Sequence, residues 1–223
     1  MKNISIAIDG PVGAGKSTIA REAANRLGFI YIDTGALYRA LGVYCADNGV
    51  DVHDDSATAD FVVGGKVDIE LKFVRNQQRV FVRNDDYTDK IRTPEASMLA
   101  SRISANPEIR SYLLELQRGF ASENSVVMDG RDIGTVVLPN ADIKIFLTAA
   151  PEDRAKRRYD ELIEKGSPAV FEDVLADLIK RDHDDSNREH APLKQARDAI
   201  VADTTGNTFE QSVELIMGLI NNG

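Results

Sequence analysis

The feature that most constrains the fold of this chain is the segment DGPVGAGKST at residues 9–18. It matches the phosphate-binding pattern G-x-x-x-x-G-K-[ST]. The run before it, ISIAID, is typical of a buried strand, and the amphipathic run after it, residues 17–27, is typical of a helix. In that context the glycines let consecutive backbone N–H groups turn inward, where they and the positive end of the helix bind phosphate. The segment therefore predicts the nucleotide-binding loop of a parallel α/β protein.

Two side chains of this loop carry the chemistry. Lys16 is expected to reach the γ-phosphate of a bound nucleotide, and the Ser17 hydroxyl is expected to bind Mg²⁺. The side chain of Val12 is dispensable, because the loop holds phosphate through its backbone N–H groups. The residues predicted to bind ATP are Gly10, Pro11, Val12, Gly13, Ala14, Gly15, Lys16, Ser17 and Thr18.

Apolar, β-branched runs alternate with amphipathic segments along the rest of the chain, which is typical of βαβ units around a parallel sheet. The predicted strands are residues 4–9, 29–33, 125–129, 143–148 and 199–203. The predicted helices are residues 17–27, 35–48, 107–122, 151–165 and 171–182. The predicted fold class is α/β, with a doubly wound five-stranded parallel sheet.

The segment VDIELKFVRNQQRVFVRND at residues 67–85 departs from this pattern. Apolar and polar residues alternate strictly in it, and a polar turn is predicted at Asn76 to Gln78. It predicts an antiparallel hairpin inserted between the second and third core strands. We interpret the acidic stretch at residues 51–60 as a solvated connection, and its His53 as a surface histidine, because no Cys or second His lies at metal-ligand spacing.

Composition limits the kinds of partner. The chain has 223 residues, 43% of them hydrophobic, which suits one domain with a sizeable core. Its formal net charge of -9 disfavours non-specific binding to nucleic acid polymers or to an anionic membrane. No segment approaches ~20 consecutive apolar residues, and the single cysteine, Cys45, lies in an apolar helical setting. We therefore expect a cytoplasmic protein without a membrane span or an internal disulfide.

Arginines that follow the predicted strands indicate a second anion site. Arg39 follows the second core strand and Arg131 follows the third, at the edge where open α/β sheets bind ligands. Arg presents a planar fork that fits phosphate, as transfer between two nucleotides requires. A guanine-reading Asn-Lys-x-Asp segment does not occur in the sequence. The pattern favours a kinase that acts on a nucleoside monophosphate. A kinase for another small acceptor and a non-catalytic ATP-binding module remain open alternatives.

Four segments, GPVGAGKST, DTGALYR, DGRDIGTVV and RDHDDSNREHAPL, together resemble the bacterial cytidylate kinases of the nucleoside monophosphate kinase family. The resemblance runs from the first strand to the last. It implies transfer of the γ-phosphate of ATP to CMP or dCMP, giving ADP and CDP or dCDP, with Mg²⁺ and by a monomer. It also implies one kinase domain with an enlarged insert and a lid. The core is expected at about residues 1–35, 105–150 and 190–223, the monophosphate-binding insert at about 36–104, and the short helical lid at about 151–168.

The resemblance implies roles for individual residues as well. It assigns the acceptor phosphate to Arg39, Arg131 and Arg188, the cytosine ring to Ser101, Arg110 and Asp132, and the ribose to Arg181 and Asp185. The other substrate-binding residues that it implies are Asp33, Thr34 and Gly35. Asp129 joins Ser17 as a residue for Mg²⁺. Two bland alternatives stay open: Ser101 as an exposed helical serine, and Arg181 and Asp185 as a surface ion pair.

The assigned base-binding residues fit the chemistry of cytosine. Its exocyclic amine can donate to Asp132, and Arg110 can donate to the ring acceptors. Uracil would place a carbonyl against the Asp132 carboxylate, so the site is expected to reject UMP. An ion pair of Asp132 with Arg131, or a turn cap, is the structural alternative.

Catalysis is expected to be direct in-line transfer without a covalent intermediate, and no general base is required because the acceptor oxygen already carries negative charge. At least one of Arg154, Arg157 and Arg158 in the lid is expected to contact the ATP phosphates and to help exclude water. His183 and His190 lie near the expected site without an expected role. The predicted catalytic residues are Lys16, Arg131, Arg188, Arg157 and Arg158.

Overall fold

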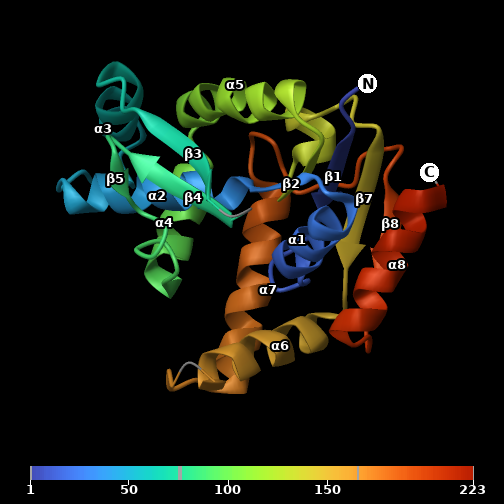
Figure 1. The fold of residues 1–223 in the computed structure, drawn as a ribbon. Coiled ribbons are helices and arrows are strands. Elements are labelled where there is room, and N and C mark those ends of the chain that lie inside the picture. The colour runs from blue at the N-terminus through green and yellow to red at the C-terminus, as the bar shows by residue number, and fades with distance from the viewer. Residues whose placement is uncertain (1, 75–76, 165, 223) are drawn as a thin grey trace.

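The computed structural model describes residues 2–74, 77–164 and 166–222. A five-stranded parallel sheet forms the core, in the order β2-β6-β1-β7-β8 (Figure 1). Its strands are β1 (Ser5–Asp9), β2 (Ile30–Asp33), β6 (Val126–Gly130), β7 (Ile143–Thr148) and β8 (Ile200–Asp203). Each lies within one residue of its predicted bounds. The chain leaves β1 toward one edge of the sheet and later returns to fill the other, so the loop after β1 lies at the topological switch point.

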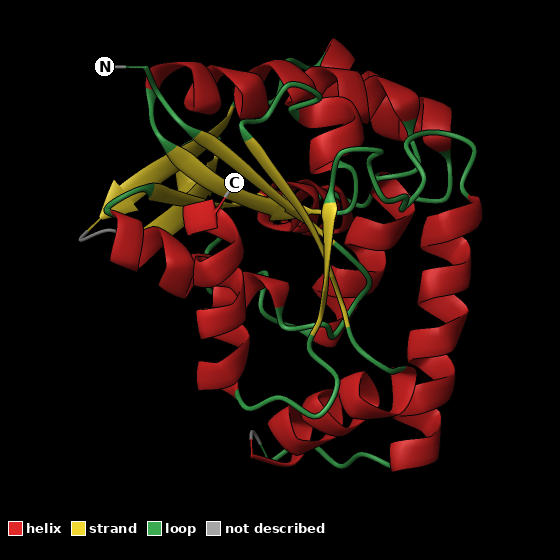
Figure 2. Cartoon of the chain, turned by 90° about the vertical axis from the view of Figure 1, so that its right-hand side faces the viewer, coloured by secondary structure: helices red, strands yellow, loops and turns green. Residues whose placement is uncertain are grey.

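Helices cover both faces of this sheet, because its strands are apolar on both sides (Figure 2). Ile6 and Ile8 of β1 cluster with residues of α1 (Lys16–Leu27) and α8 (Phe209–Asn222). Ala7 of the same strand clusters with the opposite layer, which includes α2 (Thr34–Asp47) and α5 (Pro107–Glu123). The doubly wound α/β fold that the sequence predicts is therefore confirmed.

The insert lies between β2 and β6 and contains the predicted antiparallel hairpin. Its elements are α3 (Asp55–Ala59), the π-helical turn η1 (Asp60–Gly64), β3 (Ile69–Val74), β4 (Gln77–Val82), β5 (Asp85–Asp86) and α4 (Pro94–Ile103). Gln78 pairs with Phe73 inside β4, so its assignment to the turn is wrong, and Asn76 lies outside the described residues. The hairpin and α3 lie together at the left in Figure 1, away from both termini.

The acidic stretch at residues 51–60 is more ordered than predicted. Asp54 caps α3 by accepting a hydrogen bond of 2.9 Å from the Ala57 N–H, and Thr58 is buried. An N-terminal cap and one buried face suffice to form a short helix here. Most of the stretch, including His53, is exposed, as expected for a solvated connection, but the short helix within it was not predicted.

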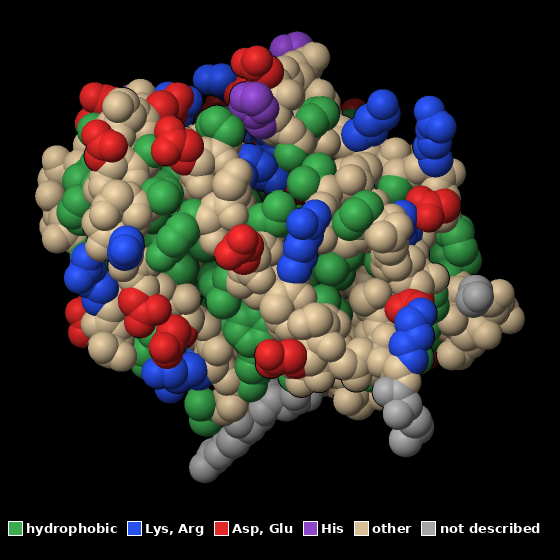
Figure 3. Space-filling model, turned by 90° about the horizontal axis from the view of Figure 1, so that it is seen from above, with side chains coloured by type: hydrophobic (Ala, Val, Ile, Leu, Met, Phe, Trp, Pro, Cys, Tyr) green, Lys and Arg blue, Asp and Glu red, His purple; other side chains and the backbone are tan. Residues whose placement is uncertain are grey.

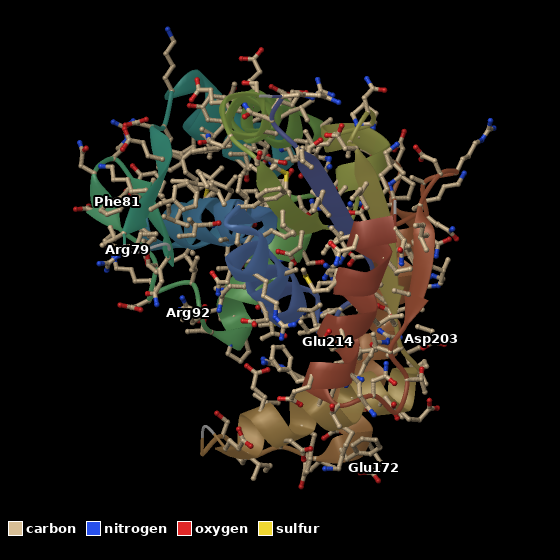
Figure 4. All side chains as sticks on the ribbon, turned by 45° about the vertical axis from the view of Figure 1, so that its right-hand side comes forward. Arg79, Phe81, Arg92, Glu172, Asp203 and Glu214 are labelled. Atoms are coloured by element: carbon tan, nitrogen blue, oxygen red, sulfur yellow. The ribbon has the colours of Figure 1, made fainter. Side chains whose placement is uncertain are left out.

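Two helices, α6 (Pro151–Glu164), which covers most of the segment expected to form the lid, and α7 (Phe171–Asn187), pack against each other. In Figure 1 they project below the core, and α7 runs back toward it. Glu172, in the first turn of α7, lies beside α6, far from the hairpin residues Arg79 and Phe81 (Figure 4). The helix α7 extends beyond its predicted end at residue 182, because its last turns are polar and are held by side-chain contacts that apolar periodicity does not reveal.

On the face shown in Figure 3, Lys and Arg side chains are scattered among Asp and Glu side chains. Within residues 2–74, 77–164 and 166–222, no helix is long and apolar enough to cross a bilayer. Cys45 is fully buried in the core, as its apolar setting predicts.

Candidate active site

The phosphate-binding loop joins β1 to α1, as predicted. Gly10 has a φ of 153°, and a Cβ atom at this position would lie 1.9 Å from the carbonyl oxygen of Leu147, so only glycine lets the loop pass β7. Gly15, with a φ of 85°, is the N-cap of α1. This left-handed backbone favours glycine and turns the chain into the helix. The positive end of α1 therefore lies directly after the loop.

Lys16 is buried beneath this loop, with 6% of its surface exposed. Its ammonium donates a hydrogen bond of 2.7 Å to the carbonyl oxygen of Pro11. Burial, together with the charge of Arg131, lowers the pKa of Lys16. A phosphate anion at the loop would oppose that shift, because it favours the charged ammonium.

Asp129 ends β6 opposite the loop, also buried, and faces two hydroxyl groups. The Ser17 hydroxyl donates to one of its carboxylate oxygens over 2.9 Å, and the Tyr31 hydroxyl donates to the other over 2.8 Å. Burial and the nearby Asp33 raise the pKa of Asp129. Asp9, the last residue of β1, is buried as well, and its carboxylate accepts hydrogen bonds of 2.7 Å from the N–H groups of Ile133 and Gly134.

The oxygen atoms of Ser17 and Asp129 fit Mg²⁺, which uses few protein ligands and completes its shell with phosphate oxygens and water. No group of three or more His, Cys, Asp or Glu side chains able to hold a metal occurs in the part of the chain that the structure describes.

Five of the predicted acceptor-site residues meet in one ionic cluster, which we call the acceptor cluster. Its members are Arg110, Arg131, Asp132, Asp185 and Arg188. Arg131 donates to Asp185 over 2.8 Å, and Arg110 pairs with Asp132. Arg188 lies between the two carboxylates, 3.7 Å from Asp132 and 4.0 Å from Asp185. These residues come from α5, the end of β6, α7 and the segment after it, so the fold assembles what the sequence separates.

Among the described residues, the two acids of the acceptor cluster form neither of the simple ion pairs nor the turn cap considered above. Asp132 pairs with Arg110 and Arg188 rather than with Arg131, and its side chain does not cap the π-helical turn η2 (Ile133–Val137). Asp185 bonds to Arg131, which lies on another element, rather than to Arg181 on its own helix. Both acids thus face inward.

Arg188 has an unusual environment within this cluster. Its Nη2 atom is buried and has no hydrogen-bond partner in the described part of the chain. Burial, together with the charge of Arg110, lowers the pKa of Arg188. Buried donors are nearly always satisfied in native proteins. A donor of this kind in a cationic cluster is suited to an anionic ligand.

Arg39 takes a different position from the other predicted phosphate ligands. It pairs with Asp33 over 2.6 Å, and both line a cleft of about 610 Å³ between β2 and the hairpin. Arg79 and Arg92 line the same cleft and lie on the hairpin side of the molecule (Figure 4). Burial of Asp33 acts to raise its pKa, but the Arg39 guanidinium outweighs this effect, and the pKa of Asp33 is lowered. Arg39 therefore lies at the edge of the insert, where it pairs with Asp33, and not in the acceptor cluster.

The segment after β2 is tied to both neighbours. Asp33 caps α2 by accepting from Ala36 N over 3.0 Å, and the Thr34 hydroxyl donates to the Asp129 carbonyl over 2.9 Å. A Cβ atom at Gly35 would lie 3.1 Å from Arg39, so a side chain there would crowd the guanidinium. This segment keeps the start of α2 close to the end of β6.

Gln78 of the hairpin is a residue that the sequence analysis missed. Its side-chain oxygen accepts from the Asp33 N–H over 2.8 Å, and its side-chain amide donates to the Asp33 carbonyl over 3.1 Å. The amide thus pairs with the free edge of β2 as a neighbouring strand would. A single glutamine in an alternating strand carries no signal of this role. Tyr31 was also missed, because a tyrosine in an apolar strand does not indicate which residue its hydroxyl group contacts.

The remaining predicted ligands lie at the margin of the acceptor cluster. Ser101 is exposed on α4, in agreement with the open alternative for this residue. One turn later the carbonyl of Ser104 accepts from Arg110 over 3.2 Å. Arg181 is half-buried on α7, and burial, with the charge of Arg131, lowers its pKa.

The three lid arginines have three different environments. Arg154 is buried and reaches the phosphate-binding loop, where it donates to Val12. Arg157 donates to the Thr204 carbonyl over 2.7 Å, which joins α6 to the segment after β8. Arg158 pairs with Glu161 of its own helix over 2.7 Å and is about one-third exposed. Of the three, Arg158 is held by the weakest kind of contact, a surface pair.

Comparison with known proteins agrees with this geometry. The family model described as Cytidylate kinase matches residues 6–222. The chain is 48% identical over 219 residues to the cytidylate kinase of Caldicellulosiruptor bescii, covering 98% of this chain and 96% of that protein. It is 46% identical over 215 residues to the cytidylate kinase of Carboxydothermus hydrogenoformans, covering 96% of each.

Solved structures share the fold at lower identity. An uncharacterized protein from Eubacterium ventriosum matches over the whole of both chains with a TM-score of 0.52 and 15% identity. A gluconokinase from Sinorhizobium meliloti matches 98% of this chain and 92% of its own with a TM-score of 0.50 and 14% identity. The full-length family match and the identity to curated relatives show that the chain belongs to the cytidylate kinase family.

Proposed function

We propose that the protein transfers the γ-phosphate of ATP to CMP or dCMP, giving ADP and CDP or dCDP. The observation that carries the proposal is the acceptor cluster: a buried acid and arginine, Asp132 and Arg110, beside the arginines Arg131 and Arg188. The pair matches the donor and acceptors of cytosine, and the arginines match a phosphate. Family membership supports the same reaction.

On the donor side, residues 10–18 hold the phosphates of ATP through backbone N–H groups, and Lys16 bridges toward the γ-phosphate. Mg²⁺ in this site would neutralise the charge of the phosphates during transfer. Ser17 and Asp129 are the residues that would hold it. Tyr31 fixes the orientation of Asp129 through its hydroxyl group.

On the acceptor side, Arg131, Arg188 and Arg39 bind the monophosphate. For Arg39 this requires exchange of its Asp33 partner for the ligand, since both lie at the cleft between β2 and the hairpin. The cytosine ring lies between Asp132 and Arg110, with Ser101 at its margin. The ribose is bound by Asp185 and Arg181, and the segment Asp33, Thr34 and Gly35 completes the site.

Transfer needs no general base, because the attacking oxygen of the monophosphate is already charged. Catalysis is positioning and charge neutralisation by Lys16, Arg131 and Arg188. Arg157 and Arg158 act from the lid, residues 151–168, where closure also excludes water. The core, at about 1–35, 105–150 and 190–223, binds ATP, and the insert at about 36–104 closes on the monophosphate. The protein acts as a monomer.

Product analysis tests the reaction. The chain is incubated with ATP, CMP and Mg²⁺, and nucleotides are separated by anion-exchange chromatography. We expect CDP and ADP to form in equal amounts, with neither forming when CMP or ATP is left out. ADP without CDP would identify an ATPase and contradict the proposal.

A further inference from the structure

Arg154 on α6 has a role that its sequence position does not reveal. The side chain is 5% exposed and makes three hydrogen bonds. Its Nε donates to the Ala149 carbonyl over 2.8 Å, and its Nη1 donates to the Val12 carbonyl over 2.9 Å and to a carboxylate oxygen of Asp182 over 2.7 Å. The guanidinium is therefore engaged on the outer side of the phosphate-binding loop.

Asp182 on α7 completes this arrangement. Its second carboxylate oxygen accepts from the Val12 N–H over 3.4 Å. Both backbone groups of Val12 are thus bound by one ion pair, the N–H by Asp182 and the carbonyl by Arg154. One residue of the loop is thus fixed in orientation by side chains from the two helices α6 and α7.

Close packing holds the next residue of the loop against the same helices. Gly13 has a φ of 74°, and a Cβ atom there would lie 3.2 Å from a methyl carbon of Leu178 and 3.3 Å from the Cβ of Arg154. Leu178 is itself buried. Since glycine loses more conformational freedom on ordering than any other residue, a loop with three glycines gains most from such external supports.

We propose that Arg154 and Asp182 are a positioning pair, which holds Val12 and Gly13 so that the inner N–H groups of the loop are preorganised for the phosphates of ATP. The inference rests on the proposed function in that ATP is the donor. Arg154 acts here through the loop and not by contacting a phosphate. The Arg154 guanidinium contacts the Val12 carbonyl and Asp182, whereas Arg157 and Arg158 on the same helix would contact the nucleotide.

Two variants distinguish a positioning role from direct contact with a phosphate, because the two roles predict opposite effects of Asp182→Asn on ATP affinity. If Arg154 positions the loop, Arg154→Met and Asp182→Asn both weaken ATP and ADP by the same factor, about tenfold for the loss of a buried charged hydrogen bond. If Arg154 contacts the γ-phosphate, Arg154→Met weakens ATP more than ADP. Under that alternative Asp182→Asn strengthens ATP binding, because it removes a negative charge beside the arginine.

The affinities of the full chain for ADP, for a non-hydrolysable ATP analogue and for CMP are each measured by isothermal titration calorimetry. Lys156→Met is the matched control, since Lys156 lies on the same helix, is exposed and pairs only locally with Asp160. We expect the control to bind all three ligands as the unchanged protein does. We expect the two variants to keep their affinity for CMP within about twofold, because the acceptor cluster uses neither residue.

Several results would overturn the proposal: unchanged ADP affinity, loss confined to the ATP analogue, tighter ATP analogue binding by Asp182→Asn, or an equal loss of CMP affinity. The Asp182→Asn change preserves side-chain shape, so it supplies the answer if Arg154→Met does not fold. Binding is measured without turnover. A protein that binds ADP but phosphorylates no CMP would contradict the proposed function and leave the positioning role untouched.

Discussion

At the scale of single residues, the site contains oppositely charged side chains that are largely buried and pair with one another. Asp132 and Arg110 are each about one-tenth exposed and pair directly. Breaking such a pair leaves a buried charge uncompensated, which costs more than the pair itself contributes. Substitutions at these positions are therefore expected to alter specificity as well as affinity.

Asp132→Asn tests cytosine recognition. The amide can donate as well as accept, so it can turn a donor toward the carbonyl of uracil. We expect kcat/KM for CMP to fall by about two orders of magnitude and the ratio of CMP to UMP to fall with it. The measurement is kcat/KM with both acceptors at saturating ATP, and Asp198→Asn, at an exposed residue, is the control. An unchanged ratio would remove Asp132 from the base pocket.

Lys16→Met tests the donor site. Methionine is similar in length and apolar, and Lys16 is buried, so the fold is expected to persist. Loss of one preorganised positive group is expected to lower kcat by about 10²- to 10³-fold. Turnover is followed by a coupled ADP assay and the fold by circular dichroism. A folded variant with a near-normal rate would place the transfer chemistry elsewhere.

At the scale of elements, the insert is docked on the core by side-chain amide pairing as well as by apolar contacts. Gln78 pairs with both backbone groups of Asp33, next to Arg39. A change in this contact moves the hairpin relative to the cleft that contains Arg39. The helix α7 contacts both sites, through Asp182 at the phosphate-binding loop and Asp185 at Arg131.

Gln78→Ala is expected to raise KM for CMP by roughly threefold to tenfold, because two hydrogen bonds that position the insert are lost, while KM for ATP stays within error. Gln77→Ala is the matched control, since Gln77 is the exposed neighbour in the same strand. Steady-state kinetics with each substrate varied in turn gives both constants. An equal rise in KM for ATP, or a rise in the control, would contradict the docking role.

Sequence patterns predicted elements well where apolar periodicity was strong. All five core strands and the hairpin follow from alternating or continuous apolar runs. The short helix α3, the helix α4 and the C-terminal helix α8 were not among the predicted helices. Two of them do carry local start signals in the sequence: Asp54 is the N-cap of α3, and Thr93 followed by Pro94 begins α4.

The site residues likewise divide into those whose positions a local motif predicts and those whose partners depend on tertiary packing. Lys16, Ser17 and Asp129 were predictable because motif and strand end fix their positions. The partners of Asp132 and of Arg154 were not, since they come from other elements and depend on how α5, α6 and α7 pack. Motifs thus indicate which residues gather, and tertiary packing decides which residues pair.

At the scale of the whole molecule, the insert and the core share one apolar cluster, so a residue buried in it becomes accessible only when the structure opens. Cys45 of α2 lies in it, fully buried, among residues of β3, β4 and α4. Burial raises the pKa of Cys45 from 9.0 to about 11. Since the folded value exceeds the unfolded one, burial favours the protonated thiol, and the associated stability is present below pH 9.0 and is lost progressively as the pH rises to about 11.

Alkylation of Cys45 by iodoacetamide at pH 8 is expected to be much slower in the native protein than in guanidinium, because the thiol is fully buried and its raised pKa lowers the fraction of reactive thiolate. The rate therefore measures transient opening. Mass spectrometry of quenched samples follows the reaction. Native labelling as fast as in guanidinium would show that α2 does not pack in the core as described.

The most direct test of the central claim is the acceptor profile. ADP release from ATP with Mg²⁺ is measured in parallel with CMP, dCMP, UMP, AMP and GMP, and in a blank without acceptor. We expect fast turnover with CMP and dCMP alone, because cytosine offers an amine to Asp132 and ring acceptors to Arg110, whereas uracil has a carbonyl in place of that amine. Equal turnover with UMP or a purine monophosphate would contradict the assignment of the acceptor cluster, and turnover in none would contradict a kinase.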